Sequence, residues 1–376
     1  MRAPVRYHFL DVLRGLAALW VFVHHLPFRS SYPEKYPQLE AFCRLGHLGV
    51  PMFFVISGFC LMASLRSAQR KGEGPRSFLY RRFRRIYPPF WCSLVVFLGM
   101  PYLLELISSL RTGSFLRPAF PFAEEGKLFW IRIGTLSQVF VPGFPNLPTK
   151  FSGINPPNWS LAIEVQFYVV MALCLEFSHR MSKWILLTVT LVSVPLTLIP
   201  CAYNIGIFLP YWPMFAIGIL LYCVLEGNFW PTRILANRVV AAICLGVLLG
   251  LILCFKSLTI GSLELNHHLF AIGLAFVLWL GHSLDSLWSK AIVSQNLLIF
   301  SIAKVFTFLG AMSYTVYLLH GAVTYLAAQL IRQVMPETSM GFPPAIVAGT
   351  LVMCIPFYFL CERPFIKPSE STKRPS

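Results

Sequence analysis

The chain has 376 residues, of which 56% are hydrophobic and only 12% are charged, and its mean hydropathy is +0.66. A soluble globular domain carries about 25% charged residues, so this composition excludes one. Lys and Arg number 31 against 15 Asp and Glu, a net charge of +16. These basic residues lie between long apolar runs without any zinc-finger, helix-turn-helix or RNA-binding spacing. We therefore expect no nucleic-acid binding, and interpret the excess as basic loops of a membrane protein.

Apolar segments long enough to cross a membrane recur along the whole chain. A membrane-spanning helix needs about 20 apolar residues. Ten segments meet or approach this length: 9–28, 46–65, 86–107, 159–178, 184–200, 205–225, 239–256, 266–283, 305–331 and 342–361. The sequence therefore predicts an all-α integral membrane protein of about ten transmembrane helices. Residues 1–363 form its membrane domain, and 364–376 form a short polar cytoplasmic tail.

The loop charges predict the orientation of these helices. If the N-terminus is inside, the inner loops carry twice as many Lys and Arg as the outer loops, and the loop 66–85 is the most basic. Because short basic loops stay in the cytoplasm, both termini are predicted to be cytoplasmic. The long connection 108–158 is then outside. Its stretch 128–141 is too short and polar to span the membrane, so we expect it to lie at the interface or to fold back.

The first predicted helix carries charged residues within its apolar run. Arg14 and His25 are 11 residues apart, which is 1100° of rotation and about 20° from three full turns, so they share one stripe about 16.5 Å apart. His24 is rotated about 80° the other way. Asp11 can pair with Arg14. Either this stripe is functional, as buried charges in a bilayer usually are, or both ends snorkel to the interfaces and His25 caps the helix.

The fourth predicted helix begins at Asn158 and contains a polar stripe. Ser160, Glu164 and Tyr168 are spaced i, i+4 and i+8, so they lie on one helix face. If this helix enters from outside, Glu164 lies at the depth of His25, where it could orient the imidazole or hold its proton. The alternative is a structural Glu that hydrogen-bonds within the bundle.

Two further motifs are candidates for chemistry. Four arginines lie within residues 81–85, and at least one of them should point into the bundle, where a guanidinium suits bidentate phosphate recognition. A membrane anchor is the other interpretation. The segment 313–320, in a predicted span, ends in His320 and contains two tyrosines before it. His320 is either a functional residue or part of a structural hydrogen-bond network with these tyrosines.

The motifs together resemble the acyltransferase 3 family, multi-helix bacterial membrane enzymes that transfer acyl groups to carbohydrate hydroxyls. The resemblance covers nearly the whole chain and departs from the family pattern at Val12, where Gly or Ser is frequent. It rests on six segments in order, namely LDVLRG at 10–15 with His25, GVPMFFVISGF at 49–59, RRFRRIYP at 81–88, NWSLAIEVQFY at 158–168, SYTVYLLH at 313–320 and ERPF at 362–365.

The resemblance implies site residues and substrates. It implies an arginine–histidine pair at Arg14 and His25, an acyl-CoA-binding pair at Arg82 and Arg85, and an acidic position at Glu164. The expected reaction moves an acyl group, most often acetyl, from cytoplasmic acyl-CoA to a hydroxyl of a carbohydrate or glycolipid acceptor, such as a polysaccharide or lipopolysaccharide. The expected location is the bacterial inner membrane, with no metal and no permanently bound cofactor.

Roles for these residues follow from that reaction. His25 is expected to take the proton of the sugar hydroxyl, either directly or through an acyl-enzyme. Arg14 either lines the acyl-CoA path or stabilises developing charge. Arg81 joins the acyl-CoA site, and four residues are supporting: Asp11, Ser160, Tyr168 and His320. Because no extracytoplasmic domain follows the last helix, we expect the acceptor to meet the membrane domain directly. A proton-coupled transporter and a non-catalytic scaffold are the alternatives.

Overall fold

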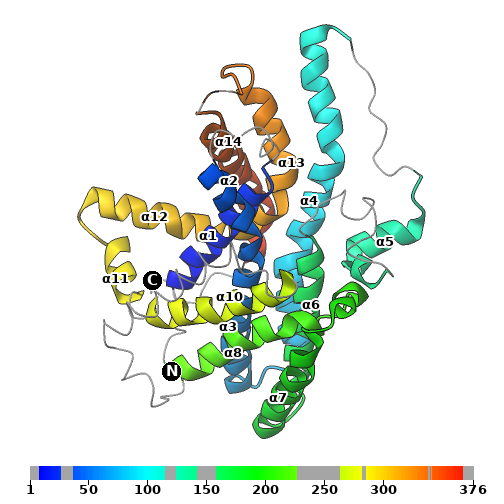
Figure 1. The fold of residues 1–376 in the computed structure, drawn as a ribbon, viewed down its shortest axis with the longest axis vertical. Coiled ribbons are helices and arrows are strands. Elements are labelled where there is room, and N and C mark those ends of the chain that lie inside the picture. Colours follow the sequence, from blue (N-terminus) through cyan, green and yellow to red (C-terminus); the bar gives the residue numbers. More distant parts are fainter. Residues whose placement is uncertain are drawn as a thin grey trace, which may run out of the picture.

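The computed structural model describes residues 8–26, 37–114, 124–141, 158–226, 263–281, 285–337, 339 and 341–366. Within these ranges the chain is helical and forms no strand (Figure 1). The α-helices are α1 (His8–His24), α2 (Pro37–Arg44), α3 (Gly49–Arg70), α4 (Pro75–Thr112), α5 (Lys127–Thr135), α6 (Asn158–Leu173), α7 (His179–Leu196), α8 (Trp212–Glu226), α10 (Leu263–Gly281), α11 (Asp285–Ile292), α12 (Leu297–Ala311), α13 (Ser313–Ile331) and α14 (Phe342–Phe357).

Several of these helices are long and apolar enough to cross a membrane. Four segments of the described chain qualify: Glu40–Arg70, Pro75–Leu110, Leu209–Glu226 and Phe342–Phe365. The pair α12 and α13 is a fifth if it is counted as one bent span. Helices α6 and α10 are apolar but shorter. The chain is thus a multi-pass helical membrane protein. The count of ten spans and the positions of the termini stay predictions, and the expected span 239–256 lies outside the described residues.

The basic segment 66–85 differs from its prediction as a loop. Only a short turn separates α3, which ends at Arg70, from α4, which begins at Pro75. Proline suits the first turn of a helix because it has no N–H to leave unpaired there, and the following arginines are good helix formers. The four arginines at 81–85 therefore lie on a helix, where Arg82 and Arg85 are three residues apart and share a face.

The predicted span 305–331 is broken in the structure. Helices α12 and α13 meet at Met312 and are bent by 74°. The carboxylate of Glu362 accepts hydrogen bonds from the backbone N–H (3.0 Å) and the hydroxyl (2.5 Å) of Thr315 in the first turn of α13. A carboxylate at this place satisfies a donor that the new helix start leaves unpaired and interacts favourably with the helix dipole.

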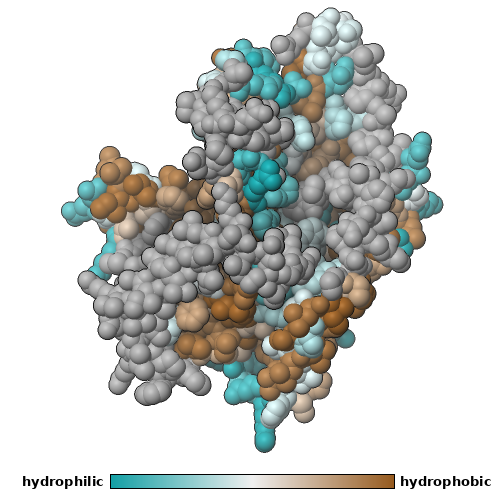
Figure 2. Space-filling model, in the orientation of Figure 1, coloured by the Kyte–Doolittle hydropathy of each residue, from teal (hydrophilic) through white to brown (hydrophobic). Residues whose placement is uncertain are grey.

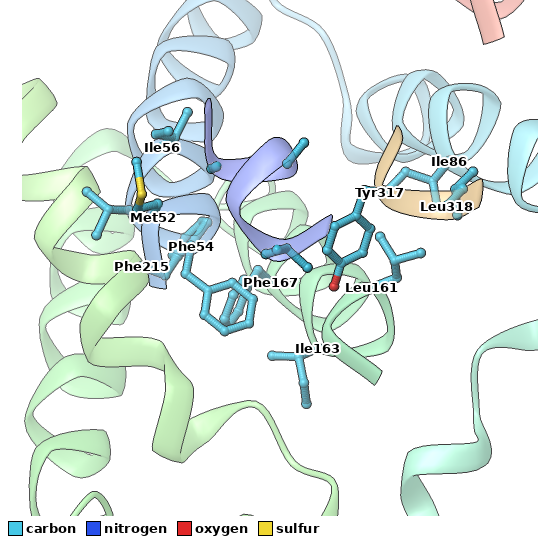
Figure 3. Close-up of a cluster of buried hydrophobic side chains, with 14 of the residues drawn as sticks. Met52, Phe54, Ile56, Ile86, Leu161, Ile163, Phe167, Phe215, Tyr317 and Leu318 are labelled. Atoms are coloured by element: carbon cyan, nitrogen blue, oxygen red, sulfur yellow. The ribbon is translucent and has the colours of Figure 1, made fainter. Parts of the chain in front are cut away.

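Helix α3 is the centre of the packed core. It packs against α1, α6, α8 and α10, and Figure 3 shows its side chains Met52, Phe54 and Ile56 beside residues of α6, α8 and α13. A Cβ placed on Gly218 of α8 would lie 2.0 Å from the Val55 carbonyl oxygen of α3. Only glycine allows this close approach of two backbones, which is the usual way helices associate in a membrane.

The segment 124–141 folds back onto α4. Trp91 donates its indole N–H to the Gly134 carbonyl (2.8 Å), and the Tyr87 hydroxyl donates to the Thr135 carbonyl (3.1 Å). Helix α5 therefore lies along the first half of α4, while the last turns of α4 extend beyond the other helices (Figure 1). Of the two predicted placements of 128–141, at the interface or folded back, the contacts with Tyr87 and Trp91 agree with the second.

Candidate functional site

The arginines of α4 divide into two pairs. Arg81 forms an ion pair with Glu73, and Arg84 donates a hydrogen bond to the Pro364 carbonyl (3.4 Å). Arg82 instead turns toward α6, with its guanidinium carbon 5.8 Å from the ring centroid of Tyr168. Arg82 and Arg85 both interact electrostatically with Glu164. The helix therefore directs Arg82 and Arg85 into the bundle, while Arg81 and Arg84 make contacts elsewhere.

Glu164 lies between these arginines and α3. Its Oε1 accepts hydrogen bonds from the Tyr168 hydroxyl (2.6 Å) and from the Ser57 hydroxyl (3.0 Å). The i, i+4 stripe predicted on this helix is therefore present. Ser57 belongs to the motif at 49–59, in which the sequence predicts no site residue.

Two more charged residues complete this end of the site. Glu362, only 4% exposed, interacts electrostatically with Arg85 and Arg14. Cys60 of α3 interacts electrostatically with Arg14 and Asp11 of α1. It also interacts electrostatically with Arg82 and Arg85 of α4, so both helices bring charged groups to the same part of α3. We name the group Arg14, Arg82, Arg85, Glu164 and Glu362 the arginine cluster. Buried charges in a membrane protein are costly without partners, and here both signs occur together.

One buried donor of the arginine cluster has no hydrogen-bond partner among the described residues. This donor is the Nε atom of Arg82. Beside it lies a cavity of about 180 Å³ lined by Arg82, Tyr168 and apolar side chains of α4 and α6. This is smaller than the roughly 300–1,000 Å³ that holds a drug-sized molecule, so it suits a narrow group such as a phosphate or an alkyl arm.

A second polar group joins α6 to α13. The hydroxyls of Ser160 and Tyr317 are 2.5 Å apart and buried. The Tyr317 ring also lies 6.3 Å from the ring of His320. The sequence predicts Ser160 and His320 as supporting residues, whereas it includes Tyr317 only among the tyrosines of the motif at 313–320. Its position in the motif at 313–320, three residues before His320, is the signal that could have found it.

Imidazoles gather at the end of α1. The centroid separations are 5.2 Å for His25 and His320, 5.0 Å for His24 and His25, and 5.7 Å for His24 and His47. A further 5.2 Å separates His47 from His267. We name these five residues the histidine cluster. His320 is buried and His25 is exposed.

Hydrogen bonds set the tautomers of the two central imidazoles. Nδ1 of His25 lies 2.8 Å from the Val21 carbonyl, and Nδ1 of His320 lies 3.1 Å from the Val316 carbonyl. A carbonyl only accepts, so each Nδ1 carries the proton and donates it. The Nε2 lone pair is then the basic atom of each neutral imidazole, as a general base requires.

The depth of Glu164 differs from the expectation that it lies at the level of His25. Ser160 is bonded to Tyr317, which is three residues, or about 4.5 Å of rise, from His320. Glu164 is four residues, or about 6 Å, from Ser160 in the other direction. About 10 Å of depth thus separates Glu164 from the imidazoles. Within the described residues its hydrogen bonds go to hydroxyls, not to a histidine.

Comparison with known proteins gives the family of this chain. The sequence profile of the acyltransferase 3 family, an acyltransferase domain, matches residues 7–361. The chain belongs to the acyltransferase 3 family. No solved structure matches it significantly.

Curated relatives of this acyltransferase 3 chain include bacterial enzymes. It is 25% identical over 354 residues to the peptidoglycan O-acetyltransferase OatA of Listeria monocytogenes, which covers 87% of this chain and 51% of OatA. It is 31% identical over 171 residues to the acyltransferase MdmB of Streptomyces mycarofaciens, covering 45% of this chain and 39% of MdmB. The putative peptidoglycan O-acetyltransferase YrhL of Bacillus subtilis is 29% identical over 180 residues, 46% of this chain and 24% of YrhL. The chain spans about half the length of OatA and less of the other two.

Proposed function

We propose that this protein is a membrane O-acyltransferase that moves an acyl group from cytoplasmic acyl-CoA to a hydroxyl of an exported carbohydrate. The acyl group that we propose is acetyl. The donor binds at the arginine cluster and the acceptor at the histidine cluster. The family and the names of the relatives OatA and YrhL support this class of reaction. Their bacterial origin supports a location in the bacterial inner membrane.

The observation that carries the proposal is a line of polar side chains through an apolar bundle. It begins at Arg82 and Arg85, continues through Glu164 to the Ser160–Tyr317 pair, and ends at the imidazoles of His320 and His25. Polar groups in a bilayer are expensive and mark substrate paths. This line joins an anion-binding end to a basic end, as a transfer between a phosphate-rich donor and a neutral hydroxyl requires.

The arginine cluster suits the donor. Among the described residues, none accepts a hydrogen bond from the Nε–H of Arg82 beside the narrow cavity. Arg85 is three residues further along α4 and shares its face. Guanidinium groups recognise phosphate oxygens by paired, charge-assisted hydrogen bonds. The nucleotide end of acyl-CoA is too large for a cavity of about 180 Å³. We therefore place a phosphate or the thioester arm there, and Arg81 at the outer edge of the donor site.

The histidine cluster suits the proton transfer. Nε2 of His25 takes the proton of the sugar hydroxyl while the hydroxyl oxygen attacks the thioester carbonyl. The carbonyl carbon gains a C–O bond and loses its C–S bond, and the departing thiolate accepts the proton that His25 carried. The products are a carbohydrate ester and free CoA. Arg14 and Glu164 act on the donor side, where they fix the charge balance around Arg82 and Arg85.

Surface-carbohydrate mass tests the proposal. Host cells that express the chain should add mass equal to one acetyl group to a surface carbohydrate, and cells with His25→Ala at equal membrane abundance should not. His24→Ala changes the neighbouring imidazole, which lies off the predicted stripe and is 3.2 Å from the Cys43 carbonyl through Nδ1, and these cells should keep much of the added mass. The proposal would be contradicted if the carbohydrate had the same mass in cells with the wild-type chain and in cells with His25→Ala. Solute uptake by the wild-type chain without acyl-CoA would then favour a proton-coupled transporter.

A further inference from the structure

A second cavity lies away from the proposed reaction path, on the opposite side of α3. It is an apolar groove of about 680 Å³ between α3, α7, α8 and α10. Its walls open outward: Leu187, Leu220 and Ile272 are 45–63% exposed. Figure 2 shows apolar residues over the lower part of the molecule, where Figure 1 places α7 and α8. In a membrane protein such a surface faces hydrocarbon.

The few polar side chains along this groove are already satisfied. The Thr190 hydroxyl donates to the Leu186 carbonyl and accepts from the Trp212 indole. The Thr197 hydroxyl donates to the Val194 carbonyl (2.7 Å), and His268 donates from Nε2 to the Pro210 carbonyl (3.0 Å). An occupant of the groove therefore does not need to form hydrogen bonds with these side chains, which suits a hydrocarbon chain.

Two cations stand at one end of the groove. Arg66 and Lys183 line it, and none of its described lining residues is a carboxylate, whereas Glu73, Glu176 and Glu226 line the neighbouring pocket. Neither cation forms an ion pair within the described ranges. Arg66 lies against the imidazole of His179, 2.5 Å from Nδ1. A guanidinium has five N–H donors, so this contact leaves others for an anion.

The charged end opens into a polar pocket. Arg66 and Cys223 line both the groove and a neighbouring pocket of about 890 Å³, which includes Glu73, the ion-pair partner of Arg81. The cations are thus at the arginine-cluster end of the bundle, one turn inside the end of α3 and the start of α7. From Lys183 to Thr197 the groove follows 14 residues of α7, about 21 Å, which exceeds the roughly 15 Å of one hydrocarbon leaflet.

From this geometry we infer that the groove is a binding site for a phospholipid, with its phosphate on Arg66 and Lys183 and one acyl chain along α7 and α8. The charge complementarity selects a phosphate-bearing lipid over a neutral one. The remaining headgroup atoms occupy the polar pocket. This site is separate from the proposed acyl transfer and stands whether or not that function is correct.

Lipid binding to the purified full chain tests the inference. The protein in detergent is titrated with phosphatidylglycerol, and bound lipid is counted by native mass spectrometry. Wild type should bind it tightly, and the double variant Arg66→Ala, Lys183→Ala should bind roughly tenfold or more weakly, because charge-assisted contacts are lost. Arg180→Ala, an exposed cation near the start of α7 that lines neither cavity, should bind as wild type. Equal binding by the double variant would overturn the inference.

Two further arms separate the chain from the headgroup. A neutral diacyl galactolipid with the same chains should bind at least tenfold more weakly than phosphatidylglycerol, and glycerol phosphate without chains should not compete. Ala216→Phe fills the groove and should weaken binding, whereas Val192→Phe on α7, outside the groove, should not. If Ala216→Phe does not fold, a chain-diazirine phosphatidylglycerol on wild type should label peptides of α7 and α8. Labelling elsewhere, competition by glycerol phosphate or equal binding of the galactolipid would overturn the site.

Discussion

The arginine cluster and the histidine cluster stabilise polar side chains within the apolar helix bundle by different interactions. The arginine cluster joins residues of four separate segments and balances its three arginines with Glu164 and Glu362. The histidine cluster consists of imidazoles in ring contact, with Nδ1 of His25 and His320 on backbone carbonyls. The first holds fixed charge and suits binding an anion. The second brings imidazole nitrogens together and suits moving a proton.

The largest effect is expected at the histidine cluster. His25→Ala should lower acyl transfer by about 10²–10⁴-fold, because a general base contributes this much. The donor should still bind, since the arginine cluster is unchanged. Transfer and acetyl-CoA binding are measured on the same purified protein. If His24→Ala abolishes transfer while His25→Ala keeps it, the assignment of the base is reversed.

At the arginine cluster the expected effect falls on the donor. Arg82→Ala and Arg85→Ala should each weaken acyl-CoA use by about 10- to 150-fold, which corresponds to about 1.5–3 kcal/mol for a charge-assisted contact. Arg84→Ala is the matched control, because Arg84 donates to the Pro364 carbonyl instead of facing α6. The dependence of rate on acetyl-CoA concentration distinguishes these variants. If acyl-CoA use weakened equally in all three variants, the arginines at 81–85 would not form a specific donor site and would be interpreted as a membrane anchor.

A smaller effect is expected where Glu362 links the arginine cluster to α13. Glu362→Gln keeps an oxygen for Thr315 but removes the charge that faces Arg85 and Arg14. We expect acyl-CoA use to weaken about tenfold, since a hydrogen bond to a charged group is worth about 1.5–3 kcal/mol and a neutral one about 1 kcal/mol. Melting temperature in detergent is measured beside activity. A large loss of stability with normal donor affinity would make Glu362 purely structural.

The smallest effect is expected between the clusters. Tyr317→Phe removes the hydroxyl that lies 2.5 Å from Ser160 and leaves the ring against Phe53 and His320. One buried hydrogen bond is worth about 0.5–1.5 kcal/mol, so transfer should fall by about 2- to 12-fold. Ser160→Ala should give a similar loss, and the double variant should lose little more. Additive losses would show that the two hydroxyls do not act as a pair.

The sequence predicted what one helix determines by itself. Periodicity placed Glu164 and Tyr168 on one face, and their hydroxyl–carboxylate bond is present. Periodicity did not give the depth of α6 relative to α1. The position of one helix along another depends on contacts between residues far apart in sequence, such as Ser160 and Tyr317, which are separated by 157 residues. The bend at Met312 was missed for the same reason, since the carboxylate that stabilises the start of α13 comes from Glu362, 47 residues on.

Motifs found residues of both clusters but not their partners. Arg82, Arg85, His25 and His320 belong to recognisable segments, whereas Cys60 and His47 are single residues whose neighbours only folding supplies. The length of α4 also exceeded its predicted span of 86–107, because hydropathy alone stops at the first arginines while the backbone continues as a helix from Pro75.

Sidedness of the reaction tests the central claim, that donor and acceptor meet from opposite ends of the bundle. Sealed proteoliposomes of the full chain receive acetyl-CoA inside or outside and a soluble oligosaccharide outside, so the result does not depend on how the protein inserts. We expect ester formation on the external oligosaccharide when acetyl-CoA is inside and none when both substrates are outside. Ester formation with both substrates on one face of sealed vesicles would contradict this claim.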